Sequence, residues 1–261
     1  MDLLLTVYHD ELMTFWLVLT RLSGMMVLAP IWGSRTIPRR IRAFLAVGLA
    51  LVITPLVWHQ PAPYPDNLIM LAILAGCELA IGLTIGLAIK MYFAGLQLAG
   101  QLMGQMSGMS LANIASPSFD ANVSVFSQML HVLMLAIFVI TGGHRRLLGA
   151  LIASFQSLPI GQVRLDGSLV RALTDVLQQS FVFGLQIAAP VMVAMLLSLL
   201  IMGLISRTLP QLNILAVGFS VNGLIMLATL LLCLGVLARV FEAHSLDALE
   251  ILQPVLHAGS S

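Results

Sequence analysis

The stretch LIMLAILAGCELAIGLTIGLAIKMYFAGLQLAGQLMGQMSGMS, residues 68–110, contains only two charged side chains, Glu78 and Lys90. A helix needs about 20 apolar residues to cross a hydrocarbon core of ~30 Å. At 1.5 Å per residue, one helix over this stretch would be on the order of 60 Å long. The stretch therefore predicts a membrane protein with a helix that tilts strongly, kinks or extends beyond the bilayer.

The composition of the whole chain supports the same class. Of its 261 residues, 59% are hydrophobic and 9% are charged, with a net charge of +1 and a mean hydropathy of +1.03. Soluble domains carry about a quarter charged residues. A soluble enzyme, a nucleic-acid-binding domain and a disordered chain are therefore excluded. Since the sequence contains no phosphate-loop, dinucleotide-binding or zinc-protease motif, we expect neither an enzyme nor a bound cofactor or metal ion.

Six apolar segments are long enough, or nearly long enough, to span a bilayer. They cover residues 12–31, 43–57, 68–119, 121–143, 176–206 and 212–238. We therefore expect an all-α membrane protein of about six long, partly broken apolar helices, with Pro190 bending or breaking the fifth. Residues 241–256 alternate acidic and apolar side chains at helical spacing, which predicts a surface amphipathic helix.

The arginines conflict with a simple topology. Residues 35–42 contain four arginines, which place this loop in the cytoplasm by the positive-inside rule. If every segment crosses once, the four arginines within residues 145–171 fall on the opposite side. Either one segment fails to cross, or the protein does not sit in the membrane like an ordinary transporter.

Arg21, Glu78 and Lys90 are charges inside apolar segments. A central arginine or lysine costs about 2.5–3.5 kcal/mol on insertion scales, so each should face protein or water. One interpretation is an ion or proton path. We favour the other, in which Arg21 pairs with Glu78 between packed helices and Lys90 snorkels or marks a helix end, because proton relays need chains of such groups.

Small and amide side chains recur every four residues within LQLAGQLMGQMSGMSLANIASP, residues 96–117. They are Gly100, Gly104 and Gly108 on one helical face, and Gln97, Gln101 and Gln105 on the next. Small residues let helix backbones approach, and amides hydrogen-bond between helices in lipid. The pattern therefore predicts a tight helix–helix seam.

From residue 105 onward the sequence becomes rich in glycine, methionine and serine. The segment comprises Gln105, Met106, Ser107, Gly108, Met109, Ser110, Leu111, Ala112 and Asn113. Methionine is flexible and apolar, which suits a seal that must change shape. Irregular backbone at membrane depth is tolerated only where protein buries it or where it lines a cavity. We therefore predict a pore-lining plug; the alternative is a continuation of the packing seam.

Ser220 and His131 both lie in apolar segments and could form an intramembrane serine–histidine dyad. A dyad needs the two side chains within hydrogen-bond reach. Nothing near them in the sequence supplies an oxyanion hole, so we expect hydrogen-bonded packing roles for both residues instead.

Four stretches together resemble the FliR family, the flagellar export-gate subunits of the type III secretion apparatus. They are IPRRIRAFLAVGLALVITP at 37–55, ELAIGLTIGLAIKMYFAGLQLAGQLMGQMSG at 78–108, GGHRRLLGALIASFQSLPIG at 142–161 and RTLPQLNILAVGFSVNG at 207–223. The chain departs from the family pattern where Gln101 replaces a glutamate, where Met106 and Ser107 replace Gln-Met, and where Ser116 replaces the aspartate before Pro117. Roles that need those carboxylates are not carried over.

The resemblance implies a single-copy subunit of a helical assembly with FliP and FliQ subunits, in contact with FlhB. It implies a FliP-like part at residues 1–175, with a plug at 105–117, and a FliQ-like helical hairpin at 176–240, followed by an amphipathic tail at 241–261. The assembly would lie in the bacterial inner membrane, within the flagellar basal body and largely above the ordinary membrane plane. Its lumen would be the entrance of the channel for unfolded rod, hook and filament proteins.

Two alternatives remain open. One is the corresponding subunit of a virulence injectisome. The other is a small secondary transporter in which Pro190 breaks a helix at the substrate site, although the sequence shows no inverted repeat. In each case we expect contact with membrane lipid and none with nucleic acid.

Overall fold

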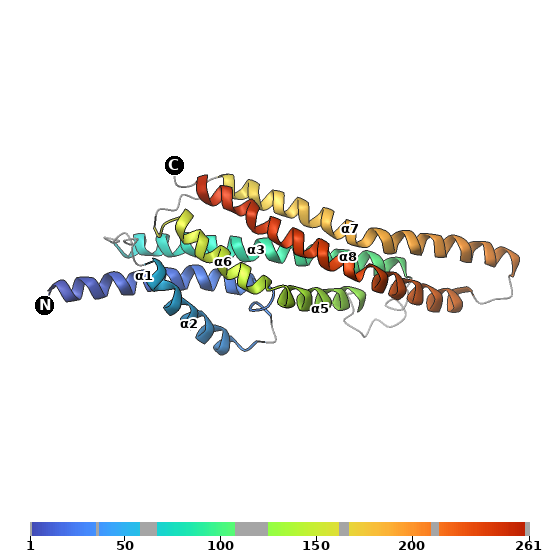
Figure 1. The fold of residues 1–261 in the computed structure, drawn as a ribbon, viewed down its shortest axis with the longest axis horizontal. Coiled ribbons are helices and arrows are strands. Elements are labelled where there is room, and N and C mark those ends of the chain that lie inside the picture. The colour runs from blue at the N-terminus through green and yellow to red at the C-terminus, as the bar shows by residue number, and fades with distance from the viewer. Residues whose placement is uncertain are drawn as a thin grey trace. The chain divides into compact units, whose positions relative to one another are not determined.

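The computed structural model describes residues 2–34, 37–57, 67–107, 125–161, 167–209 and 214–258. Every regular element in these ranges is an α-helix, which confirms the all-α prediction (Figure 1). The helices are α1 (Asp2–Leu28), α2 (Arg39–Val57), α3 (Leu68–Met106), α5 (Val125–Ile140), α6 (Gly143–Ser157), α7 (Gly167–Thr208) and α8 (Ile214–Ala258).

The membrane class is confirmed by length and composition. Within the described ranges, five helices are long and apolar enough to cross a bilayer, namely α1, α2, α3, α7 and α8. A sixth candidate is the pair α5 and α6, which meets the criterion only when its two helices are taken together and is bent by 66° at the break between them. The three longest helices have 39, 42 and 45 residues, or about 58–68 Å at 1.5 Å per residue.

Two compact units make up the chain, and each combines segments that are distant in the sequence. Unit 1 comprises residues 1–91, 141–177 and 245–261, and unit 2 comprises residues 92–140 and 178–244. The helices α3, α7 and α8 each contribute one part to each unit. The predicted division at residues 175 and 240 falls inside α7 and α8, and remains a prediction.

Unit 1 packs α1, α2 and α6 with the first part of α3. Its core holds apolar side chains of α1, such as Leu22 and Met25, and of α3, such as Ile81 and Ile85, all with at most 1% of their surface exposed. The helix α2 turns a single stripe inward, formed by Ala46, Ala50, Ile53, Thr54 and Val57. The spacing of this stripe is that of one face of a helix.

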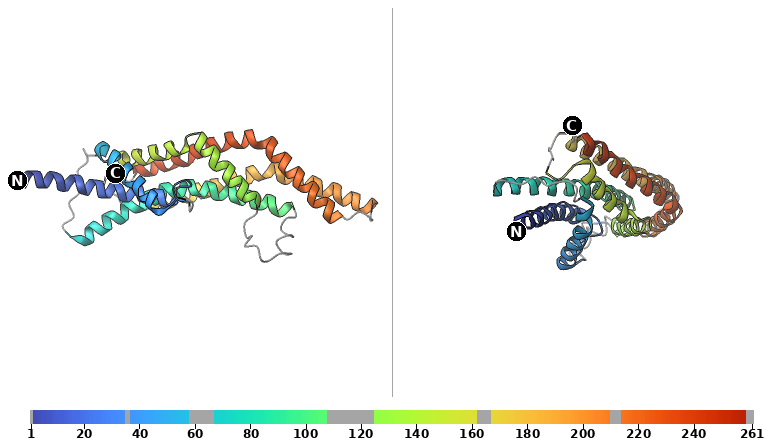
Figure 2. Two further views of the ribbon diagram at one scale, coloured as in Figure 1. Left: turned by 90° about the horizontal axis from the view of Figure 1, so that it is seen from below. Right: turned by 60° about the vertical axis from the view of Figure 1, so that its left-hand side comes forward.

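Unit 2 packs α5 with the later part of α3 and with most of α7 and α8. In this unit α7 and α8 run antiparallel beside each other (Figures 1 and 2), and the Ser198 hydroxyl of α7 donates to Asn222 Oδ1 of α8 at 2.7 Å. An aromatic cluster joins the four helices. Phe93, Phe138, Phe183 and Phe241 are all buried, with ring centroids 5.7–6.4 Å apart in the contacting pairs.

Three features of the fold differ from the sequence-based expectations. Residues 143–157, which lie mostly between the apolar segments expected at 121–143 and 176–206, form the helix α6, whose charges hid it from a search for apolar runs. Of the two outcomes expected at Pro190, a break does not occur, because α7 continues through this residue; a proline removes only one main-chain donor and its neighbours can compensate. The helix α8 continues to Ala258, so residues 241–256 extend it and do not form a separate helix.

The bend between α5 and α6 also bears on the arginine conflict. Strict alternation assumes that each segment crosses straight, and Arg145 and Arg146 lie just after a 66° bend at Thr141 and Gly142. Gly142 has φ 75°, a left-handed conformation that glycine adopts without steric cost. The assumption of straight crossing therefore fails at this pair of helices.

Candidate functional site

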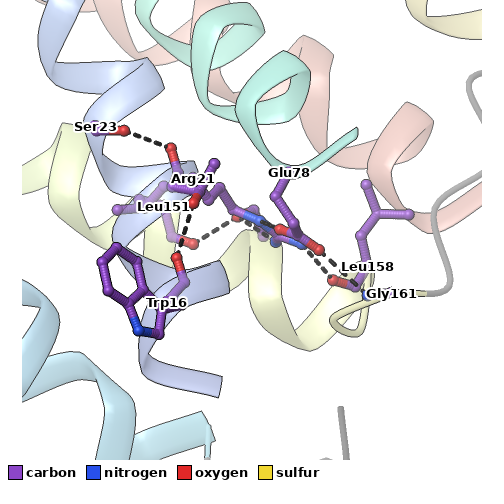
Figure 3. A network of polar contacts seen from close by, with 9 residues as sticks. Trp16, Arg21, Ser23, Glu78, Leu151, Leu158 and Gly161 are labelled. Carbon is purple, nitrogen blue, oxygen red and sulfur yellow. Dashed lines mark hydrogen bonds and ion pairs between the residues drawn. The ribbon is translucent and has the colours of Figure 1, made fainter. Parts of the chain in front are cut away.

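Two charged residues meet in the core of unit 1. Arg21 on α1 and Glu78 on α3 are each 0% exposed, and Arg21 Nε donates to Glu78 Oε2 at 2.5 Å (Figure 3). The structure thus brings together the two residues that the sequence suggested as partners. Since an isolated buried charge is very costly, pairing is what permits both residues in an apolar interior.

Arg21 uses its remaining guanidinium nitrogens on the end of α6. Nη1 donates to the Ser154 hydroxyl and Nη2 to the main-chain carbonyl of Leu158, both at 3.1 Å. The guanidinium also lies 4.1 Å from the centroid of the Phe155 ring. Leu158 caps the C-terminus of α6, where unpaired carbonyls and the helix dipole favour a cation. Arg21 is therefore the charged cap of α6, supplied by α1.

Glu78 is also fully engaged. Its Oε1 accepts the main-chain N–H of Gly161 at 3.2 Å. Gly161 has φ 79°, and its glycine identity fits this left-handed turn. Between α6 and this turn, Ile160 is 1% exposed. The carboxylate therefore anchors the chain that leaves α6, while Arg21 holds the helix end (Figure 3).

This network favours packing over ion conduction. Besides each other, the described partners of Arg21 and Glu78 are a serine hydroxyl, an aromatic ring and main-chain groups. A proton relay needs successive titratable groups. The arrangement instead ties α1, α3 and α6 together at one point. Lys90, the third charge singled out, is exposed on α3.

Close backbone contact joins α1 and α3 directly beside the ion pair. A Cβ added to Gly82 would collide with the carbonyl oxygen of Arg21 itself, and one added to Gly86 would lie 2.7 Å from the carbonyl oxygen of Met25. On α1, a Cβ added to Gly24 would lie 2.6 Å from the carbonyl oxygen of Leu79. Sequence reasoning missed this seam, although Gly82 and Gly86 show the same four-residue spacing that was recognised at residues 100–108.

The predicted seam at residues 97–104 lies in unit 2, between α3 and α5. A Cβ at Gly100 would collide with the Ser127 backbone, whose nitrogen would be 2.8 Å away. The Ser127 hydroxyl donates to the Gln97 carbonyl at 3.0 Å, and Gln97 Nε2 lies 3.4 Å from His131 Nδ1. Gly104 is buried and Gln101 is half-buried on the same helix. Gly100 and Gln97 therefore do contact α5.

A second contact in unit 2, between α3 and α7, was not predicted. A Cβ on Gly95 would collide with the carbonyl oxygen of Ser180, and one on Gly184 would collide with the carbonyl oxygen of Gly95. Tyr92 donates to Gln179 Oε1 at 2.9 Å beside it. The Gly95–Gly184 pair comes from separate parts of the chain, so spacing within one segment could not indicate it.

The structure describes only the first three residues of the predicted plug, Gln105, Met106 and Ser107, and these continue the helical hydrogen bonding of α3. Gln105 and Met106 are the last helical residues of α3, with Gln105 exposed. The Ser107 N–H donates to the Met103 carbonyl and its hydroxyl donates to Gly104, so helical hydrogen bonding extends to residue 107. Gly108, Met109, Ser110, Leu111, Ala112 and Asn113 lie outside the described residues.

The structure does not support a pairing of His131 with Ser220. His131, considered above as half of a dyad, faces Gln97 and packs edge-on against the Phe93 ring, whereas Ser220 is exposed on α8. Among the described residues, no group of three His, Cys, Asp or Glu side chains could hold a metal ion.

The fold and these contacts define a class: a polytopic all-α membrane protein whose helices join through glycine seams, a buried ion pair and few other polar groups. The family model described as "Bacterial export proteins, family 1" matches residues 12–248. The chain belongs to this family.

Curated relatives agree with the family match. The chain is 31% identical to the flagellar biosynthetic protein FliR of Escherichia coli over 205 residues, 78% of this chain and 77% of the relative. It is 29% identical to FliR of Caulobacter vibrioides over 90% of this chain and 94% of the relative. It is also 29% identical to FliR of Bacillus subtilis, over 87% and 88% of the two chains. The resemblance inferred from the sequence is confirmed.

Proposed function

We propose that the chain is the FliR-type subunit of the flagellar type III export gate. The observation that carries this proposal is the family match over residues 12–248. It is supported by the similarity to relatives named flagellar biosynthetic protein FliR, which extends over most of their length. In this role the chain is a single copy in a complex with FliP- and FliQ-like subunits and contacts an FlhB-like subunit. The complex forms the entrance through which unfolded rod, hook and filament proteins leave the cell.

The exposed surface of the helices supports a subunit role. Unit 2 leaves large apolar side chains uncovered along α7 and α8, such as Leu200, Leu204 and Leu232, which are 66–84% exposed. Those helices are also about twice as long as a bilayer crossing requires. Helices of partner subunits would cover the apolar side chains that extend beyond the hydrocarbon core of the bilayer. We place the complex in the bacterial inner membrane, within the flagellar basal body.

The segment from Gln105 to Asn113 is the part of the chain that we propose closes this entrance. The support is its composition, the methionines and small residues that suit a deformable apolar seal, and its start in the last turn of α3, a helix that Gly100 and Gln97 hold against α5. Neither an enzymatic activity nor a cofactor is part of the proposal.

Deletion of the gene in its own bacterium tests the proposal. Hook and filament proteins should disappear from the culture medium and accumulate in the cytoplasm, and a plasmid copy should restore their export. If export of flagellar proteins is unchanged while secretion of injectisome effectors is lost, the chain serves a virulence system instead. If neither is affected, the export role is wrong.

A further inference from the structure

The helix α2 exposes an apolar face that no part of the described chain covers. Its inward stripe occupies five positions, Arg42 and Leu49 are half-buried, and the other residues of the helix are exposed. Phe44, Val52 and Leu56 are 65–78% exposed, and Leu51 is 60% exposed. A continuous face of large apolar side chains needs either lipid or another protein against it.

Two arginines stand at the start of this face. Arg39 and Arg40 form the first turn of α2 and are exposed. Neither forms an ion pair with another described residue, and α2 contains no acidic residue. Arg42, by contrast, turns back and donates to the Ser34 carbonyl at 2.9 Å. Within the part of the chain that the structure describes, both guanidinium groups are therefore exposed and lack an acidic partner, and an external anion could reach them.

The helix dipole also favours an anion beside Arg39 and Arg40. Positive charge in a first helical turn is unfavourable, because the N-terminus of a helix already carries partial positive charge. An anion at this position would relieve the repulsion between the arginines and the dipole. It would also be met by two planar guanidinium groups, which suit the geometry of a phosphate.

The exposed face differs from the places where this chain joins helix to helix. Gly24, Gly82 and Gly86 each bring a neighbouring backbone into contact. Gly48, the one glycine of α2, has no atom within 4 Å of a Cβ built on it, and its exposed neighbours are large aliphatic and aromatic residues. Interhelical seams in membranes favour small residues, whereas apart from Gly48 this face is built mainly from the large side chains of Phe44, Leu51, Val52 and Leu56, which suit acyl chains.

The length of the helix matches the same occupant. Its 19 residues extend about 28 Å at 1.5 Å per residue, close to the ~30 Å of a hydrocarbon core. A basic end and an apolar body of this length place the arginines at the level of the headgroups, where anionic lipids attract them.

We propose that α2 is a lipid-facing helix of unit 1 and that Arg39 and Arg40 bind the phosphate groups of anionic phospholipids. The occupant is a phospholipid with its acyl chains along Phe44, Leu51 and Leu56. This inference rests on the membrane fold and on the exposed residues of α2. It does not depend on the export role, so either can fail without the other.

Photolabelling with lipids tests the proposal. The full chain, with the subunits that co-purify, is reconstituted in nanodiscs of phosphatidylglycerol or of phosphatidylcholine, each carrying a diazirine in its acyl chain. After illumination, mass spectrometry locates the labelled peptides. We expect label on residues 41–56, several-fold stronger from phosphatidylglycerol. In R39Q/R40Q this preference should fall close to one, and R39K/R40K should keep it.

The matched control is R145Q, which removes an exposed arginine from α6 in the same unit and should leave the preference unchanged. Equal labelling by both lipids in the unaltered protein would overturn the role of the arginines. Absence of label from α2, with chemical cross-links from it to a co-purifying subunit, would show that a protein covers this face and would overturn the proposal. Because the comparison of two lipids needs no variant, it stands even if R39Q/R40Q does not assemble.

Discussion

Arg21 donates to Glu78 at 2.5 Å in an interior where neither side chain has exposed surface, and the same guanidinium caps the C-terminus of α6. One arginine thereby links α1, α3 and α6. The pair tolerates burial because the remaining guanidinium nitrogens of Arg21 and the second carboxylate oxygen of Glu78 have partners in Ser154, Leu158 and Gly161.

The first prediction concerns this pair. Glu78→Gln leaves Arg21 charged and buried without its counter-ion, and breaking such a pair costs about 3–5 kcal/mol. Arg21→Met combined with Glu78→Gln removes both charges and should recover part of the loss. Thermal unfolding of the purified complex in detergent compares Arg21→Met, Glu78→Gln and the double variant. If the double variant loses the sum of the two single losses, the side chains are not energetically coupled.

The second prediction concerns the seam between α1 and α3. Gly82→Ala adds a Cβ that collides with the Arg21 carbonyl, so the two helices must separate and strain the ion pair. Yield and melting temperature should both fall. Gly76→Ala is the matched control on the same helix, because its Cβ would meet no atom within 4 Å. Equal behaviour of the two variants would mean that α1 and α3 do not touch at Gly82.

The third prediction concerns the seams of unit 2. Gly100→Val would push α5 away at Ser127, and Gly104→Val would place a branched side chain at a buried position one turn later. Export should fail because the amount of assembled complex falls. Gly203→Val, on a helix surface with nothing within 4 Å of its Cβ, should affect packing within this chain less. A normal yield of complex from Gly104→Val would place that glycine outside a packing seam.

The fourth prediction concerns the aromatic cluster. Phe241 is 1% exposed and contacts Phe93, Phe138 and Phe183. Phe241→Ala should leave a cavity and cost roughly 3–5 kcal/mol of stability. Phe219→Ala, on the same helix but 44% exposed, should cost much less. Comparison of the two melting temperatures in detergent tests this, and equal losses would show that Phe241 is no core residue.

The fifth prediction concerns the proposed plug. Deletion of residues 105–113 should spare the flanking helices, because Gly100 and Gln97 hold α3 to α5 upstream of it. The complex should therefore assemble and leak ions that the intact complex excludes. The conductance of bilayers that contain the deletion variant, together with the yield of assembled complex, distinguishes a plug from a packing segment. Loss of the complex would support a packing segment, and an assembled complex that stays tight to ions would leave the segment a linker.

Much of the fold could be predicted because long apolar runs leave few other structures possible. The helices α1, α2, α3, α7 and α8 follow such runs, and α6 was missed because Arg145 and Arg146 interrupt its apolar character. The pairing of Arg21 with Glu78 follows from the cost of a lone buried charge.

The partners that complete that pair could not be predicted. Ser154, Leu158 and Gly161 lie 83–137 residues away along the chain from Arg21 or Glu78, and two of them contribute only main-chain atoms, which carry no sequence signal. The contact of Gly95 with Gly184 likewise depends on how two separate helices meet.

Co-expression with FliP- and FliQ-like subunits, followed by native mass spectrometry of the purified particle, tests the central claim most directly. The account predicts one particle that contains a single copy of this chain with several copies of both partners, and poor recovery of the chain when it is expressed alone. A stable, monodisperse monomer that ignores those partners and transports a solute in liposomes would contradict the account and identify a transporter.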